Sequence, residues 1–216
     1  MGMEGVFARW YAKSTRHDLP DFRREAGNIA KQLRPNADFL EVAPGPGYFS
    51  IELAKLGSFH ITGLDISHTC VQIARENARE QGVSVNFRQG NASAMPFESS
   101  IFDFIFCRAA FKNFSQPVEA INEMHRVLRP GGRALIFDLR KDVSSEEIDA
   151  YFKNSGRSLF DSILTRLAFR TFLIRRAYTT QAFQKMAEKS LFGRCHIVTG
   201  SIGLEASFEK PQAGQQ

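Results

Sequence analysis

The stretch DFLEVAPGPGYFSIELAKLG, residues 38–57, decides the fold of this chain. DFLEVA (38–43) is largely apolar and is typical of a buried strand. Gly45-Pro46-Gly47 predicts a tight turn, because glycine lacks a Cβ and accepts sharp backbone bends. YFSIELAKLG (48–57) then has the pattern of a helix. A strand, a glycine turn and a helix in this order let a ligand lie against the backbone, close to a helix N-terminus.

The alternation of strands and helices continues on both sides of this unit. Further strands are predicted at 60–65, 84–90, 102–107 and 133–139, and helices at 20–34, 67–82 and 115–129. Strands that alternate with helices in this way predict a parallel, doubly wound sheet. Such a sheet binds its ligands beyond the carboxyl ends of the strands, at the point where the strand order reverses.

The pattern changes after residue 140. A helical stretch (145–178) and a second helix (180–193) are predicted before two short strands, 195–200 and 203–209. The two strands predict an antiparallel hairpin that completes the sheet. The expected fold class is therefore α/β, with a Rossmann-like, mostly parallel sheet of seven strands, a C-terminal antiparallel hairpin and a helical cap insertion.

Composition limits the class of protein. Hydrophobic residues make up 43% of the chain and charged residues 24%, as in ordinary globular proteins. No apolar run reaches the ~18 residues of a transmembrane span, and the first residues, MGMEGVFARWYAKSTRHDL, lack the apolar core of a signal peptide. The cysteines Cys70, Cys107 and Cys195 are far apart in the sequence, which predicts buried free thiols, no metal site and a cytoplasmic location.

The net charge of +5 is unevenly distributed. Residues 37–152 carry a net charge of −4, whereas residues 1–36 carry +3 and residues 153–178 carry +5. Because the excess lies on flanking segments and not on the core, a nucleic-acid partner is disfavoured. The distribution favours an acidic or membrane-associated partner, or another subunit.

Acidic residues end the first two strands. Glu41 lies near the end of the first, and Asp65 closes the second, where an acid can accept hydrogen bonds from both hydroxyls of a ribose. A dinucleotide site would have the pattern G-x-G-x-x-G, but Ala43 and Ser50 stand at its first and third glycine positions. An adenosine-containing ligand is therefore favoured over a dinucleotide, with a structural turn and a helix-capping acid as the alternatives.

These motifs resemble those of the class I S-adenosylmethionine-dependent methyltransferases, in particular the small-molecule branch. The resemblance covers residues 36–140 well and the C-terminal hairpin loosely. Besides EVAPGPG and Asp65 it rests on GNASAMPF (90–97), which matches the family's G-D-A-x-x-L-P-F stretch, on FDFIFC (102–107) and on RVLRPGG (126–132). Two positions depart from the family: Ala43 replaces a usual glycine, and Asn91 replaces a usual aspartate but keeps an oxygen that accepts hydrogen bonds.

The resemblance implies an enzyme that uses S-adenosyl-L-methionine to methylate a small organic acceptor, by proximity and alignment in a desolvated pocket. The residues that it assigns to the cofactor are Glu41, Ala43, Gly45, Gly47, Asp65, Ile66, Asn91, Ala92 and Arg108. No residue is assigned to catalysis, and the candidates are Lys112, Asn113 and Tyr11. Lys112 could act as a base or bind an acidic group, or could be an ordinary solvated lysine. Tyr11 belongs to an aromatic N-terminal segment that could cover the cofactor.

The resemblance also divides the chain. One methyltransferase domain is expected over residues 1–210, followed by a tail at 211–216. Its parts are an N-terminal lid and helix (1–35), a cofactor-binding core (36–140), a helical cap insertion (141–179) and a C-terminal helix and hairpin (180–210).

The segment RSLFDSILTRLAFRTFLIRRAY, residues 157–178, is apolar almost all round, with interspersed basic residues. Three interpretations stay open: a cap over an apolar or acidic acceptor, a contact between the subunits of a homodimer, and a membrane-surface helix for a lipid-like acceptor. A monomer and a homodimer are both compatible with the sequence.

The alternative functions are a cofactor-binding partner subunit without catalysis of its own and an RNA methyltransferase, whose RNA binding would depend steeply on salt. A nicotinamide-dependent reductase is disfavoured, because the third glycine and a Tyr-x-x-x-Lys pair are missing.

Overall fold

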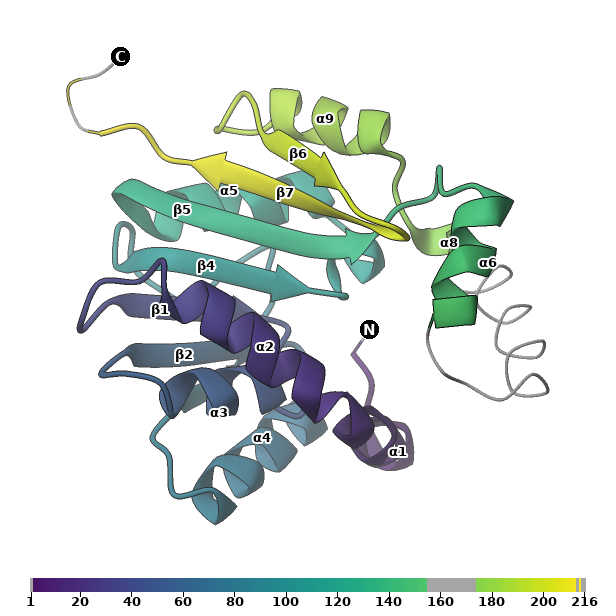
Figure 1. Cartoon of the computed structure of the whole chain (residues 1–216). Coiled ribbons are helices and arrows are strands. Elements are labelled where there is room, and N and C mark those ends of the chain that lie inside the picture. The colour runs from purple at the N-terminus through teal and green to yellow at the C-terminus, as the bar shows by residue number, and fades with distance from the viewer. Residues whose placement is uncertain (1, 155–173, 213, 215–216) are drawn as a thin grey trace.

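A seven-stranded sheet forms the centre of the computed structural model, which describes residues 2–154, 174–212 and 214 (Figure 1). The strands are β1 Asp38–Val42, β2 His60–Asp65, β3 Asn86–Gln89, β4 Phe102–Arg108, β5 Leu128–Leu139, β6 His196–Thr199 and β7 Gly203–Glu209. They are arranged in the order β3-β2-β1-β4-β5-β7-β6. β1 to β5 are parallel, and β7 is antiparallel to both β5 and β6. The predicted seven-stranded sheet and its C-terminal hairpin are confirmed.

Helices cover both faces of the sheet. The helices that the structure describes are α1 Gly5–Thr15, η1 Arg16–Asp18, α2 Leu19–Ala30, α3 Tyr48–Ala54, α4 His68–Glu80, η2 Phe111–Asn113, α5 Pro117–Val127, α6 Ser145–Asn154, α8 Ile174–Arg176 and α9 Thr180–Lys189. Figure 1 shows α2 in front of the sheet and α5 behind it. Side chains alternate between the two faces of a strand. Phe39 of β1 accordingly joins the core under α2 and α3, while Leu40 joins the core under α5 and α9.

Two local predictions can be compared directly with the structure. Ser67 caps α4 as predicted, because its side chain accepts a hydrogen bond from the backbone N–H of Cys70. The helix predicted over 115–129 is too long: α5 ends at Val127, and the next residues belong to β5. The register between β4 and β5 shifts there, because Pro130 has no backbone N–H and Gly131 adopts a φ of +79°.

The insertion after β5 is described only at its two ends. α6 and α8 lie within the stretch predicted to be helical, 145–178. Residues 155–173 lie outside the described residues, and they include most of the segment 157–178, for which three interpretations are open. None of the helices that the structure describes combines the length and the apolar character needed to cross a membrane.

The strand order fixes where a ligand would bind. The chain moves outward from β1 to β2 and β3 and then returns to form β4 on the other side of β1. The order therefore reverses between β1 and β4, and a doubly wound sheet binds its ligand beyond the carboxyl ends of the strands at this point. In Figure 1, α1 lies beyond that edge of the sheet.

Candidate active site

The turn between β1 and α3 forms the floor of the site. Ala43, Gly45 and Gly47 all have positive φ values there, of 59°, 55° and 79°. A Cβ on Gly47 would lie 2.6 Å from the ring of Phe87, so packing requires glycine at that position. At Gly45 the nearest described atom to such a Cβ belongs to Tyr11, at 3.4 Å. Ala43 holds a backbone conformation that costs an L-residue about 1–2 kcal/mol, in the place where the family usually has glycine.

Glu41 is buried beneath this turn. Its side chain projects from β1 toward α3, and its Oε2 atom accepts hydrogen bonds from the backbone N–H of Ser50 at 3.1 Å and from the Ser50 hydroxyl at 2.5 Å. Burial raises the pKa of Glu41 to about 7, against the lowering effects of Ser50 and of the Arg108 guanidinium. A nearby cation would therefore favour the ionised carboxylate.

Asp65 is held rigidly at the end of β2. It is 7% exposed. Its Oδ2 accepts a hydrogen bond from the Gly45 N–H at 2.9 Å, and its Oδ1 accepts one from the Ser67 N–H at 2.8 Å. Burial raises the pKa of Asp65, while these two backbone donors lower it. A carboxylate oxygen can accept more than one hydrogen bond, so a fixed acid in this position fits the two hydroxyls of a ribose.

An apolar side chain and a polar loop lie beside Asp65. Ile66 follows it and is 47% exposed. The backbone N–H of Gly90 donates to the Asp65 carbonyl at 2.9 Å, which brings the next residues alongside β2. Asn91 is exposed, and its Oδ1 accepts a hydrogen bond from the Ser93 N–H at 3.0 Å, while Ala92 is half-buried. The predicted Ile66, Asn91 and Ala92 thus come together next to the acid.

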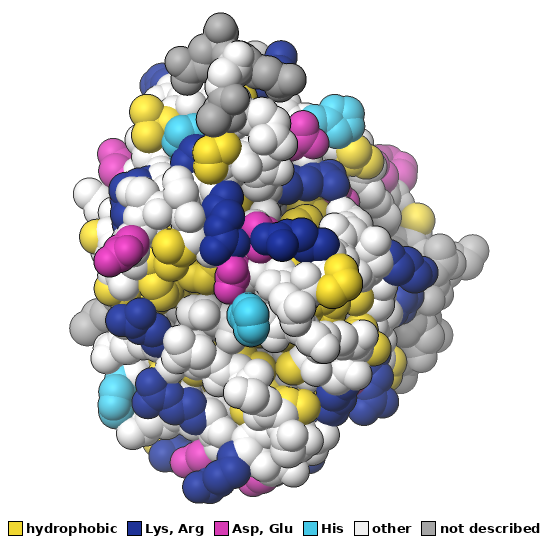
Figure 2. Space-filling view, turned by 90° about the vertical axis from the view of Figure 1, so that its left-hand side faces the viewer, with side chains coloured by type: hydrophobic (Ala, Val, Ile, Leu, Met, Phe, Trp, Pro, Cys, Tyr) yellow, Lys and Arg dark blue, Asp and Glu magenta, His cyan; other side chains and the backbone are white. Residues whose placement is uncertain are grey.

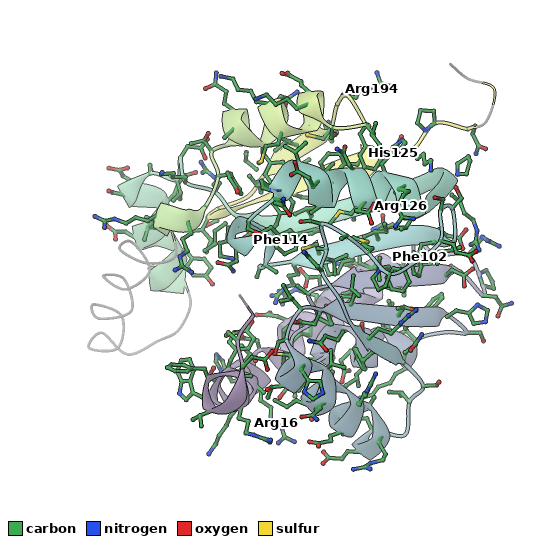
Figure 3. The ribbon with its side chains drawn as sticks, turned by 180° about the vertical axis from the view of Figure 1, so that it is seen from behind. Arg16, Phe102, Phe114, His125, Arg126 and Arg194 are labelled. Carbon is green, nitrogen blue, oxygen red and sulfur yellow. The ribbon has the colours of Figure 1, made fainter. Side chains whose placement is uncertain are left out.

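The loop over residues 91–97 is anchored by an ion pair that the sequence analysis missed. Arg126 of α5 donates to the carbonyls of Phe97 at 2.8 Å and Met95 at 3.1 Å, and it pairs with Glu123 at 2.6 Å. Glu123 in turn accepts a hydrogen bond from the Met95 N–H at 2.7 Å. Figure 3 shows Arg126 on α5, near Phe102 of β4. The spacing of Glu123 and Arg126 on one helical face was the available signal.

Arg108 is fixed by α2. Its Nε lies 2.6 Å from Glu25 Oε2, and its guanidinium lies 4.5 Å from the centre of the Phe22 ring. Burial raises the pKa of Glu25, and the Arg108 guanidinium lowers it. Arg108 was predicted at the site, but Glu25 and Phe22 were not, although their spacing places them on one face of the predicted helix.

Tyr11 reaches the turn from α1. This helix packs on α4, where Ala8 and Ala12 contact Cys70 and Ile73. The Tyr11 ring then lies against Gly45. Burial raises the pKa of Tyr11, and the Arg108 guanidinium lowers it. The structure thus brings Tyr11, Gly45 and Arg108 to one side of the site.

Lys112 is paired inside the protein. Its Nζ donates to Asp138 Oδ1 at 2.7 Å and to the Ala109 carbonyl at 2.6 Å, and its backbone N–H donates to Asp138 Oδ2 at 2.8 Å. The Lys112 and Asp138 side chains are 6% and 3% exposed. The pair therefore ties η2 to the end of β5. Asn113, the next residue, is exposed.

The opposite edge of the sheet carries a second charged cluster. Arg129 lies 2.8 Å from Asp38 and 2.9 Å from Asp103, and Arg34 lies 2.9 Å from Asp103. A cleft of about 320 Å³ adjoins these residues. Figure 2 looks onto this edge and shows acidic and basic side chains side by side near its middle. The charges neutralise one another at the amino ends of the strands, away from the glycine turn.

The sheet order and the antiparallel C-terminal hairpin are those of the class I methyltransferase fold. Residues 40–136 match the family described as "Methyltransferase domain". A demethylmenaquinone methyltransferase of Deinococcus radiodurans is 35% identical over 147 residues, which cover 68% of this chain and 58% of that protein. The ubiquinone/menaquinone biosynthesis C-methyltransferase UbiE of Shewanella sediminis is 34% identical over 125 residues, which cover 55% of this chain and 50% of that protein.

The fold agrees with a solved structure. A protein of Methanococcus maripaludis, assigned as an S-adenosyl-L-methionine-dependent methyltransferase, superposes with a TM-score of 0.73 at 20% identity, covering 97% of this chain and 94% of that one. The predicted resemblance to the S-adenosylmethionine-dependent methyltransferases is confirmed in sequence over residues 40–136 and in the fold. The chain matches 58% and 50% of the lengths of the two curated relatives.

Proposed function

We propose that this chain uses S-adenosylmethionine to methylate a ring carbon of a small, lipophilic acceptor of the quinone type, in its reduced hydroquinone form. The observation that carries the cofactor part is the hydrogen bond from the Gly45 N–H to Asp65, which joins the turn and the ribose-binding acid into one rigid unit. The names of the two relatives support the acceptor class, since one refers to demethylmenaquinone and the other to C-methylation in quinone biosynthesis.

The charges around the turn suit the amino-acid part of the cofactor. Glu41 and Arg108 project from neighbouring strands, and the Arg108 guanidinium lowers the pKa of Glu41. In this proposal Glu41 faces the cofactor's ammonium group and Arg108 its carboxylate. Asp65 accepts hydrogen bonds from the ribose, and Ile66, Asn91 and Ala92 lie along the adenine.

The cofactor supplies a methyl group on a positively charged sulfur. Transfer forms a C–C bond at the acceptor ring and breaks the S–CH3 bond, leaving S-adenosylhomocysteine, and the ring carbon releases one proton. Tyr11 is the residue that we assign to the acceptor, because its hydroxyl belongs to a ring packed on Gly45. Because Lys112 forms an ion pair with Asp138, we assign to it the role of holding the loop after β4 in position. Alignment in a water-poor site then supplies most of the acceleration.

Calorimetry with S-adenosylhomocysteine tests the cofactor site. Asp65→Asn is expected to weaken binding at least about tenfold, because an amide offers one acceptor oxygen in place of two. Asp21→Asn is the matched control, since Asp21 lies on α2 and pairs with Arg24 at the surface. Equal affinities of wild type and Asp65→Asn would contradict the site.

Transfer of labelled methyl groups tests the acceptor. The protein is incubated with methyl-labelled cofactor and, in separate samples, a reduced demethylmenaquinone, a phenolic acid and transfer RNA. Label in the organic extract of the quinone sample alone is expected. Cofactor binding without transfer to any of the three would support a non-catalytic partner subunit, and label in the RNA would support an RNA methyltransferase.

A further inference from the structure

The outer face of α1 carries exposed apolar side chains that the cofactor site does not use. Val6 is 81% exposed, Phe7 76% and Trp10 66%, and Met3, just before the helix, is 44% exposed. Single exposed apolar residues are normal on protein surfaces. Here they are adjacent and include two large aromatic residues, and a contiguous apolar patch of this kind marks an interaction site.

The helix has two distinct apolar faces. At about 100° per residue, Val6, Phe7 and Trp10 fall within one arc of about 100°. Ala8 and Ala12, which pack on α4, lie on the opposite side of the helix. The inner face therefore accounts for the packing of α1 on the protein, and the outer face has a separate use. In Figures 1 and 3, α1 lies at the periphery of the molecule.

Basic residues border the outer face. Arg9 and Lys13 are exposed and lie beside the apolar arc, and Arg16 follows in η1. None of these three forms an ion pair with another residue that the structure describes. Figure 3 shows Arg16 beside α1 at the edge of the molecule. Their positive charges are thus available to an anionic partner.

We propose that the outer face of α1, formed by Met3, Val6, Phe7 and Trp10 with Arg9, Lys13 and Arg16, docks on an anionic lipid bilayer. Aromatic and aliphatic side chains enter the boundary between headgroups and acyl chains, while Lys and Arg pair with anionic headgroups. Tryptophan in particular favours this boundary. A lipid bilayer gives a role to both the apolar side chains and the flanking basic residues, whereas an apolar protein partner would use only the apolar side chains.

Docking through α1 would also place the membrane next to the active site. Tyr11 lies on the same helix and packs on Gly45, so the bilayer surface would adjoin the cofactor turn. A lipophilic acceptor could then pass from the membrane to the site over a short distance. This benefit rests on the proposed function, but the docking itself does not.

Vesicle binding tests the inference without cofactor or acceptor. Trp10 is the single tryptophan of the chain, so its fluorescence reports directly on the docking face. Vesicles of phosphatidylcholine with phosphatidylglycerol are expected to shift its emission to shorter wavelength and to carry the protein in flotation. Phe7→Ser is expected to weaken binding about tenfold or more, and Lys13→Gln about fivefold on anionic vesicles only.

Leu191→Ser is the matched control, because Leu191 is 65% exposed on another part of the surface. Unchanged vesicle binding by Phe7→Ser, or no emission shift of Trp10, would overturn the proposal. A shift that depends on protein concentration without vesicles would assign the face to a second copy of the chain instead. Calorimetry with S-adenosylhomocysteine separates the two proposals, since Phe7→Ser should keep cofactor affinity.

Discussion

Replacing Glu41 by glutamine is expected to stabilise the protein at neutral and alkaline pH. The folded protein holds this carboxyl with a pKa of about 7, against its usual value of 4.5. Between these two values the folded state binds a proton that the unfolded state has released, so stability falls as the pH rises through that window. Above the folded pKa the full cost of the buried carboxylate applies.

The size of the effect follows from the two pKa values. Their difference of about 2.5 corresponds to about 3 kcal/mol, at about 1.4 kcal/mol for each pH unit. Glutamine has nearly the same shape, stays neutral, and can still accept the hydrogen bonds from Ser50. The variant should therefore gain about 3 kcal/mol relative to the wild type between about pH 4.5 and pH 8.

Urea unfolding followed by circular dichroism at several pH values measures this gain. Glu119→Gln, at an exposed position of α5, corrects for the general loss of a negative charge. The reasoning would be refuted if the difference in free energy of unfolding between Glu41→Gln and wild type were the same at all pH values. It would also be refuted if that difference decreased as the pH rises. The stabilised variant should bind S-adenosylhomocysteine at least about tenfold more weakly, if Glu41 faces the ammonium group.

Three further substitutions test the supports of the site. Lys112→Met leaves Asp138 buried without its cation and should lower the free energy of unfolding by about 3 kcal/mol. The melting point should then fall by roughly 6–12 °C. An unchanged melting point with lost activity would indicate that Lys112 is a catalytic base instead. Ala43→Gly removes the strain of the positive φ and should raise the free energy of unfolding, measured in urea, by about 1 kcal/mol. A lower free energy of unfolding in this variant would show that Ala43 is not strained. Arg126→Ala releases the loop over residues 91–97 and should weaken S-adenosylhomocysteine binding about tenfold. Equal binding would show that the loop holds its shape without the arginine.

The residues that sequence patterns located best are those at the ends of strands. Glu41 and Asp65 could be predicted because a short apolar run fixes a strand, and a residue at or next to the end of the run must lie close to the edge of the sheet. Gly45 and Gly47 follow from the turn that has to come next. In each case the local sequence determines the position.

Partners from distant elements could not be predicted in the same way. Glu25 meets Arg108 across 83 positions of the sequence, and nothing in the charge pattern of α2 distinguishes it from the neighbouring surface residues. The early end of α5 was missed for a related reason, since the residues at 128–132 join β5 through contacts with β4 and with Lys210, just after β7. Tertiary contacts outweighed the local helical pattern in that segment.

The hydrogen bond between Gly45 and Asp65 has a consequence for how the protein could evolve. It joins the chain at the ends of β1 and β2, so the residues that we propose for the cofactor are positioned by the sheet itself. The outer side chains of α1 are under no such constraint. Variants selected for a new acceptor should therefore accumulate substitutions on α1, while cofactor affinity stays constant.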